Sequence, residues 1–145
     1  MATINATIDV TSDILSYPIN INKTMEMKKF QVSTGLEETT GLRTKRFGTV
    51  TTAATIVEED ELTDGRAHKV YIRNTSASKA NFFYVAYHAS AAAADTAETI
   101  GKLYGGDWML VPFNGATGIT VASDGGIEQT LEYMVFADGI VTAKG

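Results

Sequence analysis

Alternation of polar and apolar residues runs through most of this sequence and limits what the chain can fold into. Successive side chains of a β-strand point to opposite faces, so a period of two is typical of a strand with one buried face. In residues 3–11, Ile4, Ala6, Ile8 and Val10 alternate with threonine, asparagine and aspartate. This segment is predicted to be a half-buried strand with a polar outer face, and no segment has the apolar spacing of a convincing amphipathic helix.

Further segments show the same period or a β-rich composition, and turn-forming residues separate them. They are residues 17–23, 47–57, 69–73, 81–88, 107–113, 118–123 and 127–136. The pattern predicts about nine or ten short strands in one all-β domain over residues 1–145, an antiparallel β-sandwich or jelly roll. Residues 68–136 are the best-defined part of this sandwich. The alanine-rich run 89–98 is interpreted as a loop or a single helical turn, because it has too few large apolar residues to bury a helix face.

The first third of the chain is less regular. Residues 1–15 are expected to form an N-terminal arm, and a change of alternation phase at Lys28 and Lys29 indicates a bulge. Residues 35–48 have scattered apolar positions and read as part of a long loop. Long loops in compact domains often contact partners, so residues 35–48 are a candidate adhesive arm.

Charge and composition exclude several classes of partner. The formal net charge is −5, which argues against nucleic acid because phosphate binding depends on Lys and Arg. The chain has no cysteine, so disulfides, thiolate metal sites and cysteine nucleophiles are excluded. No apolar run approaches the ~18 residues of a membrane-spanning helix, and the N-terminus lacks the pattern of a secretion signal. We therefore expect neither nucleic acid nor a membrane as a partner.

Residues suited to catalysis or metal binding are few. Histidine is the usual side chain for proton transfer near neutral pH, and the chain has only His68 and His88, at the start and end of predicted strands. Both are expected to be surface-exposed or hydrogen-bonded. Asp60 and Asp64 superficially resemble a calcium loop, but Leu62 stands at the ligand position between them, which leaves only an irregular calcium site as an alternative. Phosphate-binding loops and nucleophile elbows are absent from the sequence, so we predict no enzyme activity, no catalytic residues, no cofactor and no metal site.

Aromatic residues are concentrated in residues 81–88. Alternation places Phe82 and Tyr84 on one face of the strand and Phe83 and Tyr87 on the other, so both faces are apolar. A single free domain would expose one of them, which indicates cover by another sheet, another subunit or a ligand. The open alternatives are a core, a subunit interface, and a carbohydrate-binding platform that would use Tyr87 or Trp108.

The second half of the chain resembles small virion structural proteins of tailed phages. A strand ending in Asn-Thr-Ser, an Ile-Gly-x-Leu segment before a Gly-Asp turn, a Pro-Phe pair and two closing strands follow the order found in those proteins. The matching residues are Ile72, residues 74–76, residues 100–103, Gly106, Asp107, Pro112, Phe113, residues 119–122 and residues 132–136. They fall within roughly half of the chain, and the N-terminal 65 residues carry no recognisable resemblance.

This resemblance implies an oligomeric virion protein, often trimeric, seated on the capsid surface between capsomers and bound to the major capsid protein or other virion proteins. A capsid decoration, or cement, protein is the main hypothesis. A tail or fibre component and a carbohydrate-binding adhesion module are the alternatives. We predict that residues 1–50 make the bridging contacts and that the aromatic strands make the contacts of the homo-oligomer.

Overall fold

The chain is built from β-strands. The computed structural model describes residues 3–32, 34–36, 38–50, 52–88 and 99–141, and these form eleven strands and no helix. The strands are β1 (Asn5–Ser12), β2 (Ile19–Glu26), β3 (Glu38–Thr39), β4 (Arg43–Phe47), β5 (Ala53–Val57), β6 (His68–Asn74), β7 (Phe82–Tyr87), β8 (Thr99–Tyr104), β9 (Trp108–Phe113), β10 (Ile119–Ser123) and β11 (Gln129–Ala137). All strand pairings are antiparallel. The prediction of an antiparallel all-β chain is confirmed. Within the described ranges, no helix is long and apolar enough to cross a membrane.

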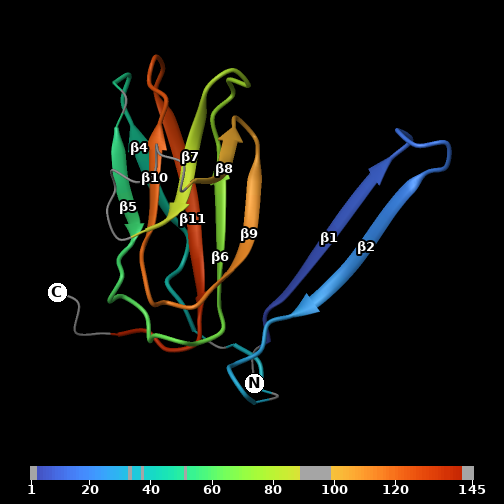
Figure 1. Cartoon of the computed structure of the whole chain (residues 1–145), viewed down its shortest axis with the longest axis vertical. Coiled ribbons are helices and arrows are strands. Elements are labelled where there is room, and N and C mark those ends of the chain that lie inside the picture. The colour runs from blue at the N-terminus through green and yellow to red at the C-terminus, as the bar shows by residue number, and fades with distance from the viewer. Residues whose placement is uncertain (1–2, 33, 37, 51, 89–98, 142–145) are drawn as a thin grey trace.

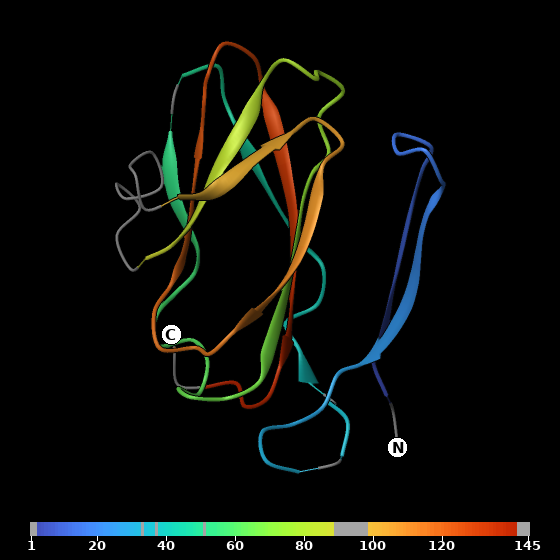
Figure 2. The same ribbon diagram turned by 45° about the vertical axis from the view of Figure 1, so that its right-hand side comes forward.

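Two sheets form the body of the molecule. One has the order β5-β10-β7-β8, and the other has the order β3-β11-β6-β9 with β4 also paired to β11. From β4 to β11 the chain passes to the other sheet at every connection except the one between β7 and β8, and the two sheets lie face to face as a β-sandwich (Figure 1, Figure 2). The pairs β4–β11, β5–β10, β6–β9 and β7–β8 are nested in the sequence. The body is thus arranged as one long hairpin, turning between β7 and β8, that has folded over itself.

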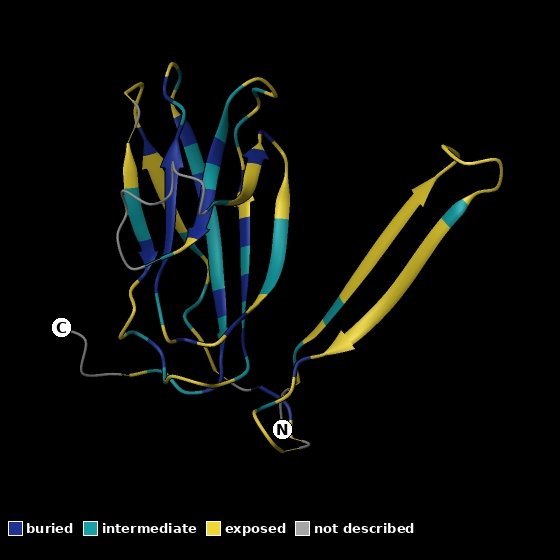
Figure 3. Ribbon diagram, in the orientation of Figure 1, coloured by how far each residue is buried: buried dark blue, intermediate teal, exposed yellow. Residues whose placement is uncertain are grey.

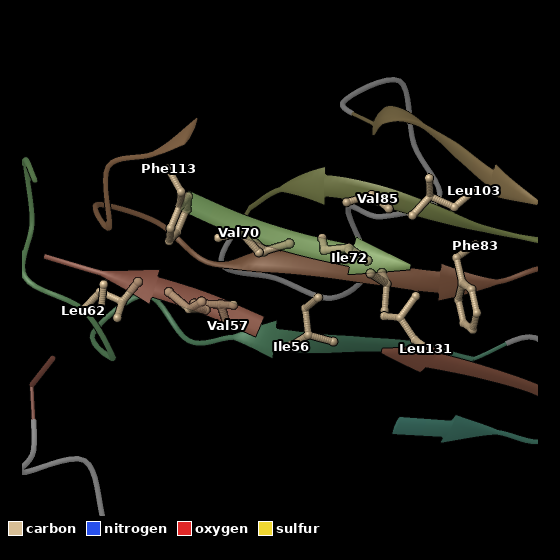
Figure 4. Packing of buried hydrophobic residues seen from close by; sticks show 14 of the residues in the cluster. Ile56, Val57, Leu62, Val70, Ile72, Phe83, Val85, Leu103, Phe113 and Leu131 are labelled. Atoms are coloured by element: carbon tan, nitrogen blue, oxygen red, sulfur yellow. The ribbon is translucent and has the colours of Figure 1, made fainter. Parts of the chain in front are cut away.

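The core lies between the two sheets, as the alternation of the strands requires. In β6, Val70 and Ile72 are completely buried, whereas Tyr71 and Arg73, which alternate with them, point outward. Leu131 of β11 and Phe83 of β7 enter the same apolar cluster from the two sheets (Figure 4). Burial of each such side chain contributes about 1.5–3 kcal/mol to folding.

The N-terminal hairpin β1–β2 stands outside the sandwich. Its strands pair in register from Asn5 with Glu26 to Ser12 with Ile19, and they form a two-stranded sheet of their own. Figures 1 and 2 show this hairpin projecting beside the body, and Figure 3 shows that almost all of it is exposed. We refer to residues 5–26 as the arm. The arm extends further along the sequence than the predicted arm of residues 1–15.

The base of the arm is fastened by backbone hydrogen bonds. The Met27 N–H donates to the Ile4 carbonyl at 2.9 Å, and the Leu36 N–H donates to the Met27 carbonyl at 2.8 Å. Both Met27 and Leu36 are buried, and Lys28 forms an isolated β-bridge with Gly35. The change of alternation phase at Lys28 and Lys29 therefore marks the end of β2 and the start of a closed loop, and the predicted bulge is wrong.

Residues 35–48 do not form a separate arm. β3 pairs with Phe136 and Ala137, and β4 pairs with residues 129–133, so this segment completes an edge of the sandwich. β8 was not predicted as a strand. The predicted loop or helical turn at 89–98 lies outside the described residues.

Candidate protein-binding surface

One face of the arm is apolar and open to solvent. The register places Ile8, Val10, Ile21 and Met25 on this face, and each of these residues is 40–45% exposed. The opposite face consists mainly of asparagine, threonine and acidic residues. An isolated two-stranded hairpin is at best marginally stable in water, because it has no second layer to cover its apolar face. The arm is therefore a surface that gains stability when another element covers it.

The arm tip, residues 13–17, includes Ile14, the most exposed large apolar side chain among the described residues. Ile14 is 80% exposed, Tyr17 is 67% exposed and Leu15 is 49% exposed. The Ser12 hydroxyl accepts a hydrogen bond from the Ile14 N–H at 3.1 Å, which stabilises the turn. Asp13 precedes these apolar residues, so the arm tip combines one carboxylate with three large apolar side chains.

The outer face of the β6–β9–β11 sheet carries a second apolar region. Trp108 is 53% exposed, and Tyr71, Leu110 and Phe136 are half-buried beside it. The Tyr71 hydroxyl donates to Oε1 of Glu132 at 2.8 Å. Burial, followed by this bond to a carboxylate, raises the pKa of Tyr71 above its usual value of 10.0. The phenol therefore stays neutral at physiological pH and adds to the apolar character of this face.

A trench separates the arm from this sheet. It consists of two adjoining hollows of about 610 Å³ and 260 Å³, which share Ala6, Thr7, Trp108 and Leu110 as lining residues. The remaining lining residues are Asn5, Ile8, Lys23, Thr24, Met25, Met27, Tyr71, Arg73, Gly106 and Phe136. Among the described residues that line the trench, the charged ones are the cations Lys23 and Arg73 and none is a carboxylate. The trench is thus an apolar groove with positive charge.

A buried network holds the base of the arm against the body. The carboxylate of Asp138 accepts the Phe30 N–H at 2.7 Å, and the Asp138 N–H donates to Nδ1 of His68 at 2.9 Å. His68 is completely buried, and its Nε2 lies 2.8 Å from the Thr63 carbonyl. Because Nδ1 accepts a hydrogen bond, Nε2 bears the ring proton and donates it to Thr63. The network joins the loop that follows the arm to the start of β6 and to the end of β11.

This geometry gives His68 a structural role. Both ring nitrogens are bound to backbone groups, so neither is available to a substrate. His88 is half-buried just after β7. A groove of about 410 Å³ next to His68 is lined in part by Arg66, Lys69 and Tyr87. Burial raises the pKa of the Tyr87 hydroxyl, which donates to the Pro112 carbonyl at 2.7 Å.

The acidic loop near Asp60 and Asp64 gives no metal-binding arrangement in the part of the chain that the structure describes. No group of three or more His, Cys, Asp or Glu side chains that could hold a metal ion occurs there. Asp60 and Asp64 instead flank an open hollow together with Leu62 and Thr63.

The aromatic strand β7 uses its two faces differently. Phe83 enters the core and packs edge-on against Phe47, with ring centroids 4.8 Å apart. On the outer face, Phe82 packs against Tyr84 and against Tyr104 of β8, and the Lys102 Nζ lies 4.6 Å from the centre of the Phe82 ring. The second aromatic face is therefore partly covered by side chains of the neighbouring strand β8, a strand that the sequence pattern did not predict.

Comparison with known proteins gives no match among protein-family models, curated proteins or solved structures.

Proposed function

We propose that this chain is a structural protein of a phage virion, a capsid decoration protein that binds the shell surface and bridges neighbouring capsomers through its arm. The observation that supports this proposal is an arm whose apolar face and tip are exposed while its base is fixed to a closed sandwich. Such a body offers a stable platform, and the arm offers adhesive surface beyond it.

The exposed area of the arm is sufficient for a specific contact. Seven large apolar residues of the arm are at least 40% exposed: Ile8, Val10, Ile14, Leu15, Tyr17, Ile21 and Met25. Together they present on the order of 700 Å², close to the ~800 Å² that each partner buries in a standard protein interface. Several such contacts on one shell act together, because binding of the first raises the effective concentration of the next.

Binding to shells tests the proposal directly. DNA-free shells of the encoding phage are mixed with the pure protein, and bound protein is measured by co-sedimentation and by mass photometry. We expect saturable binding by the wild type and at least tenfold weaker binding by the variant Val10→Ser/Ile21→Ser, which removes two paired apolar side chains from the middle of the arm.

The matched control is Val50→Ser, which changes an apolar residue that is 73% exposed in the loop between β4 and β5. This variant is expected to bind as the wild type does. Absence of shell binding at saturating protein would overturn the proposal. Electron microscopy of labelled virions separates a shell location from a tail or fibre location.

A carbohydrate-binding role is the second candidate, and the groove beside Tyr87 favours it. Tyr87 is 38% exposed and stacks on Phe113 with ring centroids 5.8 Å apart, and Arg66, Lys69 and Asn114 surround the groove. Exposed aromatic rings next to polar side chains are suited to a sugar. Glycan-array binding that is lost in Tyr87→Ala would support this candidate, whereas silence of the array together with shell binding would exclude it.

A further inference from the structure

We infer that the trench is the binding site for the arm tip of a second copy of this chain, so that copies associate head to tail. The inference goes beyond the proposed function by naming a second copy of this chain as the partner of the arm tip. It is independent of the virion setting.

The first argument is reach. The trench is lined by residues near the base of the arm, among them Ala6, Ile8 and Met25, whereas the tip begins at Asp13. A strand rises about 3.3 Å per residue, so the eight residues of β1 extend for about 25 Å. The tip cannot return to the trench of its own chain without breaking the pairing of β1 with β2. A second copy can supply the tip with both hairpins intact.

The second argument is the match of size and polarity. The tip offers Ile14, Leu15 and Tyr17, which are the kind of residues that anchor protein interfaces when they fill a pocket. The larger hollow of about 610 Å³ is wide enough for such a group of side chains, and Trp108 and Leu110 give it an apolar wall. The tip and the trench are both exposed in a single copy, and the tip of one copy would cover the trench of the next.

The third argument is charge. The tip bears Asp13, and Asp9 lies three residues before the end of β1. The lining of the trench, in contrast, includes the cations Arg73 and Lys23. No carboxylate belongs to the trench lining within the described residues. An acidic tip entering a cationic groove gains attraction on approach and selects this groove over an acidic surface.

A contact between two different surfaces has a defined consequence for assembly. Each copy gives a tip and receives a tip, so the association is heterologous and produces a closed ring or an open chain. A contact between two identical arm faces would instead stop at a dimer.

Complementation between variants of the full-length protein tests the inference. The tip variant Ile14→Ser/Tyr17→Ser keeps an intact trench, and the trench variant Trp108→Ser/Arg73→Asp keeps an intact tip. Sedimentation velocity at roughly 1–100 µM, the range in which weak specific contacts form, is expected to give oligomers for the wild type and monomers for each variant alone. A mixture of the two variants is expected to form one-to-one dimers and nothing larger, because one intact junction remains.

Exchange of the two charges provides an independent test. Asp13→Arg and Arg73→Asp are each expected to weaken association by about tenfold or more, and the double variant is expected to recover most of it. Val50→Ser is the control and should associate as the wild type does. Circular dichroism of every variant checks folding; the altered side chains are exposed, so the sandwich should be unchanged.

Several outcomes would overturn the inference: a monomeric wild type at the highest concentration, a trench variant that still forms oligomers, or a mixture that stays monomeric. Shell binding is measured in parallel. A monomeric protein that binds shells would support the proposed function and contradict the tip-in-trench contact. A protein that forms oligomers and does not bind shells would support the contact and contradict the proposed function.

Discussion

Replacement of His68 by alanine is expected to lower the free energy of unfolding by about 4 kcal/mol. The imidazole is completely buried and binds two backbone groups, the Thr63 carbonyl at 2.8 Å and the Asp138 N–H at 2.9 Å. Without the ring, each of these groups loses its partner, at a cost of about 1–3 kcal/mol apiece. Loss of ring packing against Phe113, whose ring centre lies 6.5 Å away, adds about 1–2 kcal/mol for the cavity.

Urea denaturation followed by circular dichroism measures this change. For a domain of this size, a loss of about 4 kcal/mol corresponds to a fall in Tm of roughly 12–16 °C. The contrasting variant is His88→Ala, at a half-buried position, for which the expected loss is less than about 1.5 kcal/mol. A His68→Ala protein that loses less than about 1 kcal/mol would refute the reasoning, because two buried hydrogen bonds would then contribute nothing measurable.

Three further predictions concern other parts of the chain. Asp138→Ala should speed hydrogen exchange of the Phe30 amide by at least about tenfold, because that amide loses its carboxylate acceptor at 2.7 Å. Amides of β6 that bond to β11 and lie far from Asp138 should exchange as before. Gly105→Ala should cost about 3 kcal/mol in urea denaturation, because a Cβ at this position would lie 2.0 Å from the Ser78 carbonyl oxygen and the backbone would have to move; an unchanged midpoint would show that this approach is not close. Alkaline pH should destabilise the fold, because the pKa values of Tyr71 and Tyr87 are raised in the folded state. Their contribution to stability is complete below the unfolded pKa near 10.0 and is lost as the pH rises through the folded pKa values. The variant Tyr71→Phe/Tyr87→Phe should therefore show a smaller fall in urea midpoint between about pH 9 and pH 12.

Much of the sandwich was predictable because its strands bury one face. β6 and β11 alternate strongly, and their buried residues are those that the period of two selects. β7 follows the same period up to Val85, after which Ala86 is buried and Tyr87 is exposed. β4 was harder to predict, since its sequence Arg-Thr-Lys-Arg-Phe has one large apolar residue, and its stability comes from pairing with β11 and from ion pairs such as Arg43–Glu61 at 2.8 Å. β8 contains Gly101, which weakens the strand signal.

The candidate site was predictable only in part. Alternation predicted the strand that became β1, but the same pattern is expected for a strand in a sandwich, and only the tertiary arrangement leaves the arm uncovered. The trench depends on residues far apart in sequence, such as Ala6 and Trp108, which no local pattern relates. His68 was expected to be exposed or hydrogen-bonded; it is hydrogen-bonded on both nitrogens because the backbone at Asp138 passes beside it.

The nested pairing of the sandwich has a consequence for how the protein folds. β7 and β8 are neighbours along the chain, whereas the contact of β4 with β11 joins residues as far apart as Arg43 and Tyr133, which are 90 positions apart. Closing long loops is slow because their entropy must be lost before the contacts form, so the innermost pair is expected to form first and the outermost last. The arm lies outside this nest and pairs only with itself. The sandwich can therefore finish folding with the arm still uncovered, which separates folding of the subunit from its later association with a partner.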